Sequence, residues 1–133
     1  MVKVSAAVCG VLLVSAVFCM LMSANGQTQL RNPPPLIRIA ELEIDPDQIV
    51  AYKQALSDEI ATSVRDEPGV LTLYAVSVKG QPSQVRIFET YKDQAAYESH
   101  LQSPHFKKYK EVTRGMVKSL KLIETEPIML AGK

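Results

Sequence analysis

The chain has no tryptophan, and it has only two cysteines and two histidines among its 133 residues. Both cysteines, Cys9 and Cys19, lie in the first apolar stretch, so a chain that loses this stretch has no disulfide and no thiolate metal site. The sequence contains no glycine-rich phosphate loop, no metal-ligand spacing and no Ser/His/Asp arrangement. Its formal net charge is only +1, and the lack of a basic face argues against nucleic-acid binding. Any catalytic interpretation therefore depends on His100 and His105.

Residues 1–26 have the plan of a secretory signal peptide. Lys3 precedes an uncharged apolar run over 4–22, and small residues follow, with Ala24 and Gly26 suited to a cleavage site. We expect cleavage and a periplasmic or secreted protein with no stable membrane association. An uncleaved membrane anchor is the alternative, because ~18 apolar residues suffice to span a bilayer.

Residues 27–35 predict a proline-rich spacer. Three successive prolines, Pro33 to Pro35, favour an extended polyproline II conformation and exclude a helix. A chain of this length has room for one domain, which we place at 36–130.

Within this domain the spacing of apolar residues switches repeatedly between the period of a strand and that of a helix. The pattern predicts a strand over 36–44, a helix from Asp45 to Pro68–Gly69, strands over 70–78 and 83–91, helices over 93–102 and from Ser103 to about Met116, and a last strand over 119–130. The expected inner faces of the long helices are Ile49, Tyr52, Leu56, Ile60 and Val64, and Phe106, Tyr109, Val112 and Met116. The order βαββαβ predicts an α+β, ferredoxin-like fold in which the helices cover one face of a four-stranded antiparallel sheet.

The predicted strand over 70–78 is apolar on both faces. Val70, Tyr74, Val76 and Val78 alternate with Leu71, Leu73 and Ala75. One layer of helices covers only one of these faces, and soluble monomers rarely expose a large apolar patch. We therefore predict a homodimer whose sheets pack face to face.

The segment from about Leu36 to Leu130 resembles the antibiotic biosynthesis monooxygenase domain, and most closely the small quinol monooxygenases. "RIAELEIDPDQ" is similar to the family's first strand and turn, and "SHLQSPHFKKY" resembles its His-Leu-Gln-Thr-Pro-His stretch. The resemblance implies a dimeric α+β barrel that oxidises a small quinol or phenol with molecular oxygen and holds neither a cofactor nor a metal. Because some members of the superfamily have no established activity, a non-catalytic dimeric domain for small-molecule binding or stress response is the alternative.

Haem-degrading relatives are a third alternative within the same fold. Resemblance to them would imply a histidine ligand together with a tryptophan and an asparagine over the haem. Here Lys110 takes the ligand position, the chain has no tryptophan, and its asparagines, Asn25 and Asn32, precede the domain. Haem breakdown is therefore not predicted, and the same absences argue against a large polycyclic substrate.

The implied oxidation needs a base, because oxygen accepts an electron more readily from a phenolate than from a neutral phenol. Histidine suits this role, since its ordinary pKa of ~6.5 lies close to working pH. His105 lies near the start of the helix opened by Ser103 and Pro104, where the helix dipole favours the neutral ring. His100 ends the preceding helix and reaches the same cleft if the two helices fold together. We name both histidines as catalytic candidates, against the alternative that they are surface or capping residues.

We expect an apolar cleft between the helices and the sheet to hold the substrate. The candidate lining residues are aromatic or flexible apolar side chains, namely Tyr74, Tyr97, Phe106, Tyr109 and Met116. Glu41 and Arg86 alternate with apolar neighbours on strands, and each is expected either to form an interface ion pair or to contact substrate.

Overall fold

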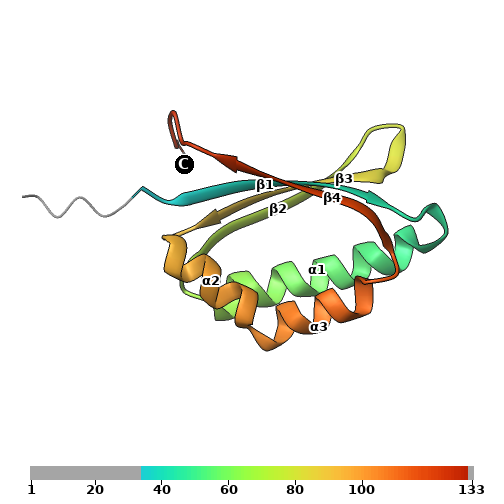
Figure 1. Ribbon diagram of the computed structural model, residues 1–133, viewed down its shortest axis with the longest axis horizontal. Coiled ribbons are helices and arrows are strands. Elements are labelled where there is room, and N and C mark those ends of the chain that lie inside the picture. The colour runs from blue at the N-terminus through green and yellow to red at the C-terminus, as the bar shows by residue number, and fades with distance from the viewer. Residues whose placement is uncertain (1–33, 132–133) are drawn as a thin grey trace, which may run out of the picture.

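A computed structural model describes residues 34–131 of the chain, so the predicted leader and most of the predicted spacer lie outside the described residues. The elements are β1 (Leu36–Ile44), a 3₁₀ turn η1 (Pro46–Gln48), α1 (Ile49–Asp66), β2 (Val70–Val78), β3 (Gln81–Tyr91), α2 (Gln94–Gln102), α3 (Pro104–Thr113) and β4 (Val117–Thr125). They form two layers, a sheet above and the helices below (Figure 1). The order confirms the predicted ferredoxin-like α+β fold.

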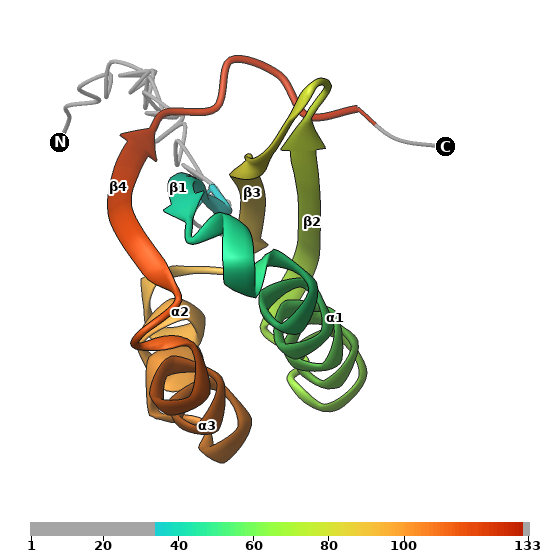
Figure 2. The same cartoon turned by 90° about the vertical axis from the view of Figure 1, so that its right-hand side faces the viewer.

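The sheet has the strand order β2-β3-β1-β4, with every neighbouring pair antiparallel. α1 runs beneath the β2 side of the sheet, whereas α2 and α3 lie beneath the β4 side (Figure 2). The space between these two groups of helices and the sheet contains the cavity described below.

Local sequence signals explain where the helices begin. Asp45 caps the 3₁₀ turn η1, which leads into α1, by accepting a hydrogen bond from the Asp47 N–H at 3.0 Å. Asp93 caps α2 by accepting a hydrogen bond from the Ala96 N–H at 2.8 Å. The Ser103 hydroxyl accepts from the Phe106 N–H at 3.3 Å, and a proline follows at the first position of α3. This cap separates α2 from α3, so the two histidines belong to different helices.

Val64 and Val112 were expected on the inner faces of the helices, but both side chains are exposed to solvent. Val64 is 48% exposed and Val112 is 50% exposed. Glu59, Ser63 and Thr113 are buried in their place, because hydrogen bonds satisfy their polar atoms inside the fold. The prediction for Val64 and Val112 was therefore wrong, because it considered only the spacing of apolar residues and not polar residues that are buried through hydrogen bonds.

β2 also differs from the prediction. The pairing with β3 shifts register between Val70 and Thr72, so Val70 is buried on the same side as Leu73 instead of sharing a face with Tyr74. Ala75 and Ser77 alternate with Tyr74 and Val76 and face the helix layer, but they are exposed. The helix layer therefore covers only the first part of β2.

β4 ends at Thr125, five residues before the predicted end at Leu130. Thr125 pairs with Ile37, next to the first residue of β1, so no partner strand remains for the residues that follow. Residues 126–131 have no regular structure, and the side chains of Ile128, Met129 and Leu130 are exposed.

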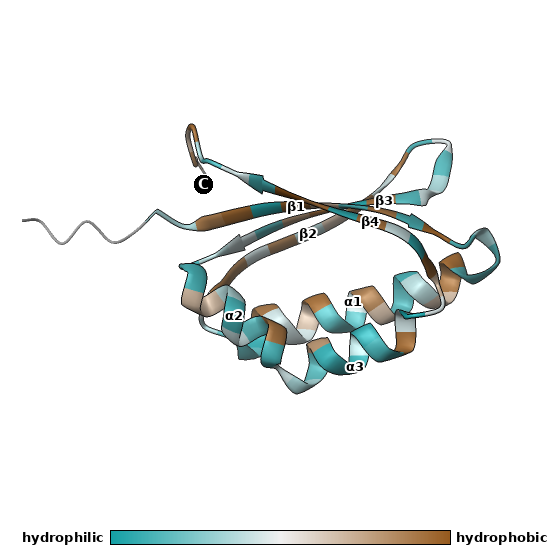
Figure 3. Cartoon of the chain, viewed as in Figure 1, coloured by the Kyte–Doolittle hydropathy of each residue, from teal (hydrophilic) through white to brown (hydrophobic). Residues whose placement is uncertain are grey.

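The core lies between the sheet and α1. Its buried residues are Ala40, Leu42, Ile44, Tyr52, Leu56, Val85 and Ile87, and a smaller cluster of Val70, Leu73 and Tyr91 packs near the start of α2. The hydropathy colouring in Figure 3 shows brown segments on the strands and on helix surfaces that face the sheet. Within residues 34–131, no helix combines the length and hydropathy that crossing a bilayer requires.

Candidate functional site

A cavity of about 230 Å³ lies between the helices and the sheet. Most of its wall is apolar and comes from residues such as Leu42, Leu56, Ile87 and Leu122. The polar groups on the wall are Glu59, Glu89, Tyr91, Tyr97, His100, Tyr109, Lys110 and Thr113. A mostly apolar cavity with a few polar groups is the usual form of a small-molecule site.

His100 is the histidine that lines this cavity. It lies in the last turn of α2 and is only 3% exposed. Its ring packs against Phe106 with centroids 4.6 Å apart and against Tyr91 at 5.4 Å. Its Nδ1 atom lies 2.9 Å from Glu67 Oε1. A carboxylate at this position accepts the Nδ1 proton, which leaves Nε2 of the neutral ring as a proton acceptor.

His105 lies on the far side of Glu67 and is not part of the cavity wall. Its Nε2 atom is 2.6 Å from the same Glu67 oxygen and 3.1 Å from the Ser103 hydroxyl. Glu67, at the C-terminal end of α1, therefore bridges the two rings. Burial raises the pKa of Glu67, but the hydrogen bonds from His100 and His105 outweigh this effect and leave that pKa below its ordinary value.

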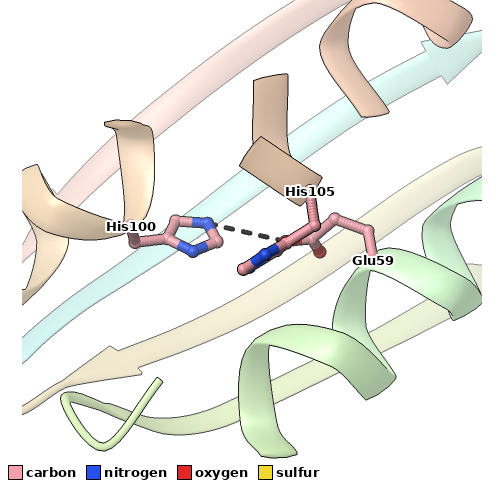
Figure 4. Close-up of side chains that lie close together, drawn as sticks. All are labelled: Glu59, His100 and His105. Carbon is pink, nitrogen blue, oxygen red and sulfur yellow. Dashed lines mark ion pairs between the residues drawn. The ribbon is translucent and has the colours of Figure 1, made fainter. Parts of the chain in front are cut away.

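Glu59 lies on α1 about two turns before Glu67 and completes the cluster with the two histidines (Figure 4). Its Oε1 atom lies 3.7 Å from His100 Nε2 and accepts a hydrogen bond of 2.6 Å from the Ser63 hydroxyl. Burial raises the pKa of Glu59, and its hydrogen bond from Ser63 and its attraction to His100 only partly oppose this.

Burial also favours the neutral forms of Glu89, Tyr91 and Tyr109 on the cavity wall, and of Tyr52 next to Tyr109. Burial raises the pKa of Glu89, which accepts a hydrogen bond from the Tyr91 hydroxyl at 3.1 Å. The hydroxyls of Tyr52 and Tyr109 lie 2.9 Å apart, and burial raises the pKa of both as well as that of Tyr91. These tyrosines therefore keep their hydroxyl protons and are not bases at neutral pH.

Apart from His105, the predicted site residues are divided between three places. Tyr97, Phe106 and Tyr109 line the cavity together with His100. Tyr74 is 68% exposed, because it pairs with Phe88 on the sheet face that points away from the helices. Met116 packs against the core and is absent from the cavity wall.

Glu41 and Arg86 are directly paired on neighbouring strands, with Arg86 Nε 3.5 Å from Glu41 Oε1. They alternate with the buried residues Ala40, Leu42, Val85 and Ile87, so they lie on the outer face and do not line the cavity between the helices and the sheet.

Sequence reasoning missed the three carboxylates of the site, Glu59, Glu67 and Glu89. A signal for the first was present, since Glu59 and Ser63 continue the buried stripe of Tyr52 and Leu56 at helical spacing. Glu89 likewise alternates with buried Val85, Ile87 and Tyr91 at the spacing of a strand. Glu67 carries no comparable signal, because its partners His100 and His105 lie far away in the sequence.

Comparisons with known proteins agree with this architecture. Residues 35–112 match the model of the family described as "Antibiotic biosynthesis monooxygenase". A crystal structure of a protein from Bacteroides thetaiotaomicron that bears the same family name is 47% identical, with a TM-score of 0.72 over 74% of this chain and 94% of that one. A monooxygenase structure from Lactobacillus acidophilus is 30% identical, with a TM-score of 0.65 over 66% of this chain and 42% of that one.

A third structure, from Nitrosomonas europaea, is only 18% identical but has a TM-score of 0.69 over 74% of this chain and 94% of that one, so it shows the shared fold alone. No curated protein matches the chain. The family match covers more than half of the chain, and it agrees with the resemblance seen in the His100 to Tyr109 segment. The chain belongs to the antibiotic biosynthesis monooxygenase family.

Proposed function

We propose that this protein is a cofactor-independent monooxygenase that oxidises a small quinol or phenol with molecular oxygen. The observation that carries the proposal is the placement of His100, a buried histidine on the wall of an apolar cavity whose Nδ1 atom is bonded to the Glu67 carboxylate. Such a ring is oriented and ready to accept a proton through Nε2.

The reaction begins when His100 Nε2 takes the proton of a substrate hydroxyl. The resulting anion gives one electron to oxygen, and the two radicals combine into a peroxide at a ring carbon. The His100 imidazolium returns its proton to the outer peroxide oxygen. The O–O bond then breaks, the carbon loses its hydrogen as a proton, and water leaves. One oxygen atom thus remains on the substrate as a new carbonyl, and the substrate supplies all the electrons.

The cavity limits the substrate by size and by charge. Its volume of about 230 Å³ lies below the range of about 300–1,000 Å³ typical of drug-sized ligands, which favours one or two fused rings. The cavity wall carries two carboxyl groups, the buried Glu59 and the half-buried Glu89, so a neutral substrate is favoured over an anionic one.

The test is oxygen uptake with menadiol, in air and with trace metals chelated. We expect the wild type to accelerate uptake and His100→Gln to lower turnover by about tenfold or more, because a positioned base usually contributes ~100-fold or more. His105→Gln is the matched control and should lose less, since His105 does not line the cavity. Because His100 is buried, circular dichroism must show that both variants are folded. Wild-type turnover in folded His100→Gln would refute this role, and menadiol binding without uptake would favour a non-catalytic binding domain.

We further propose that the protein is exported. Support comes only from the plan of residues 1–26, with its apolar run and small exit residues. N-terminal sequencing of protein recovered from the envelope should begin at Asn25 or Gln27. Recovery of the chain with Met1 intact in washed membranes would contradict cleavage.

A further inference from the structure

Three potential metal ligands converge from three helices. Glu59 comes from α1, His100 from α2 and His105 from α3, and their side chains point toward one another (Figure 4). One ligand atom of each lies within 4.8 Å of the others. Two of these atoms, His100 Nε2 and Glu59 Oε1, are 3.7 Å apart. Two ligands on one tetrahedral ion with bonds of about 2.0–2.1 Å are separated by about 3.4 Å, so this pair needs only a small adjustment.

The charges of the cluster also suit a cation. Glu59 and Glu67 are both shielded from solvent, with side chains 6% and 14% exposed. Among residues 34–131, their ion-pair partners are the two histidines, and neither carboxylate pairs with a lysine or an arginine. Buried carboxylates are costly without a compensating cation, and a dication would balance both of them while the histidines stay neutral.

A second hollow gives the cluster its own route to solvent. It has a volume of about 220 Å³ and lies between α1 and α3, where Glu59, His105 and Tyr109 line it. Glu59 lines both this hollow and the larger cavity, whereas His105 lines only the hollow and His100 only the cavity. An ion can therefore reach the cluster without passing through the proposed substrate site.

We propose that Glu59, His100 and His105 bind one divalent transition-metal ion, for which two imidazoles and a carboxylate make zinc the best-matched common choice. Glu67 supports the site from outside, since it already bonds to both rings and fixes their orientation. Histidine ligands of metal sites commonly have such a carboxylate partner. Three protein ligands leave one tetrahedral position free for water or for a ligand atom.

Occupancy of this site has a functional consequence that rests on the proposed function. A dication bound at His100 opposes the uptake of a proton by the same ring. Zinc should therefore inhibit quinol oxidation, and chelation should restore it.

The binding test uses the metal alone and no quinol. The metal-stripped full chain is titrated with Co²⁺, followed by visible absorption, and with Zn²⁺, followed by calorimetry. We expect one equivalent to bind, with the intense absorption of four-coordinate Co²⁺. His105→Ala and Glu59→Gln should each weaken zinc binding by about tenfold or more, and Glu67→Gln by about 10–100-fold.

Glu98→Gln is the matched control, because Glu98 is an exposed carboxylate on the same helix as His100. It should bind zinc like the wild type, and circular dichroism and melting temperature establish that each variant is folded. The proposal is wrong if the wild type binds less than one equivalent, or if folded His105→Ala and Glu59→Gln both keep wild-type affinity. Because these readings need no substrate, they remain valid if the protein oxidises no quinol.

Discussion

At Glu59, burial and hydrogen bonding act in opposite directions on the pKa of a single residue of the site. Its carboxyl group is 6% exposed, accepts a hydrogen bond from Ser63 and lies near His100, yet burial still raises its pKa. A raised pKa means that the folded state prefers the protonated acid. Ionisation of Glu59 therefore lowers the free energy of unfolding. Near neutral pH, Glu59 makes the folded protein less stable than it would be with a neutral side chain at this position.

We predict that Glu59→Gln stabilises the protein in a pH-dependent way. The stability that comes from the neutral Glu59 acid is fully present below the unfolded-state pKa of about 4.3 and is lost as pH rises through the higher folded-state pKa. Glutamine stays neutral and keeps an oxygen for the Ser63 hydroxyl, so it avoids this loss. Melting curves should therefore show a gain in melting temperature for Glu59→Gln at pH 8 that shrinks toward pH 4. An equal effect at both pH values would show that the ionisation of Glu59 does not limit stability.

Sequence reasoning found the two histidines but not their surroundings. The His-Leu-Gln-Ser-Pro-His stretch is a local pattern, so both residues could be named from it. Their partner Glu67 lies 33 and 38 positions away, and only the packing of α1 against α3, with α2 beside it, brings Glu67 between them. The burial of His100 could not be predicted for the same reason. It implies that substitutions of His100 also cost stability, which a residue exposed at a helix end would not show.

At the scale of elements, the position of α2 depends on a close contact with the turn before β2. Gly69 lies against Ala96 in the first turn of α2, and the Lys92 N–H donates to the Gly69 carbonyl at 2.8 Å. A Cβ atom added at Gly69 would lie 2.5 Å from the Ala96 Cβ, well inside van der Waals contact. Glycine is needed here for space and not for an unusual backbone angle.

We therefore predict that Gly69→Ala destabilises the protein by about 1–3 kcal/mol, the usual cost of overpacking. Ala96→Gly alone should cost about 1 kcal/mol, because glycine is unfavourable within a helix. If the clash is the cause, the double variant should be more stable than the sum of the two single effects implies. Urea denaturation of the four proteins measures this coupling. Strict additivity would mean that Gly69 does not set the distance between the turn and α2.

The bounds of the helices and strands were easier to predict from the sequence than the faces that they bury. β1 and β2 have the predicted bounds, and both short helices begin at caps that the sequence contains, because turn and cap residues act locally. The inner face of α1 was less predictable. Burial of Ser63 and exposure of Val64 depend on the Glu59 carboxylate and on how far β2 is covered. The register shift in β2 likewise depends on its pairing with β3.

At the scale of the whole molecule, the helices leave the outer face of the sheet uncovered (Figure 2). Tyr74, Phe88, Ile39 and Ile123 are consecutive pairing partners across all four strands, so they form one row on this face. Phe88 is 43% exposed and Tyr74 is 68% exposed. A row of large apolar side chains in water is unfavourable for a monomer and suits a self-complementary contact between two copies.

We predict that the protein is a homodimer joined through this row and that Phe88→Asp converts it into folded monomers. The substitution places a charge on the outer face, where it opposes association but does not enter the core. Leu73→Asp is the contrasting variant, because Leu73 is 8% exposed on the helix side and a charge there should unfold the chain. Sedimentation velocity gives the assembly state, and circular dichroism shows whether each variant is folded. If the wild type sediments as a monomer, or if Phe88→Asp remains a dimer, the row does not form the contact. If the wild type is a dimer and Phe88→Asp remains one, residues 126–131, with exposed Ile128 and Met129, are the next apolar surface to test.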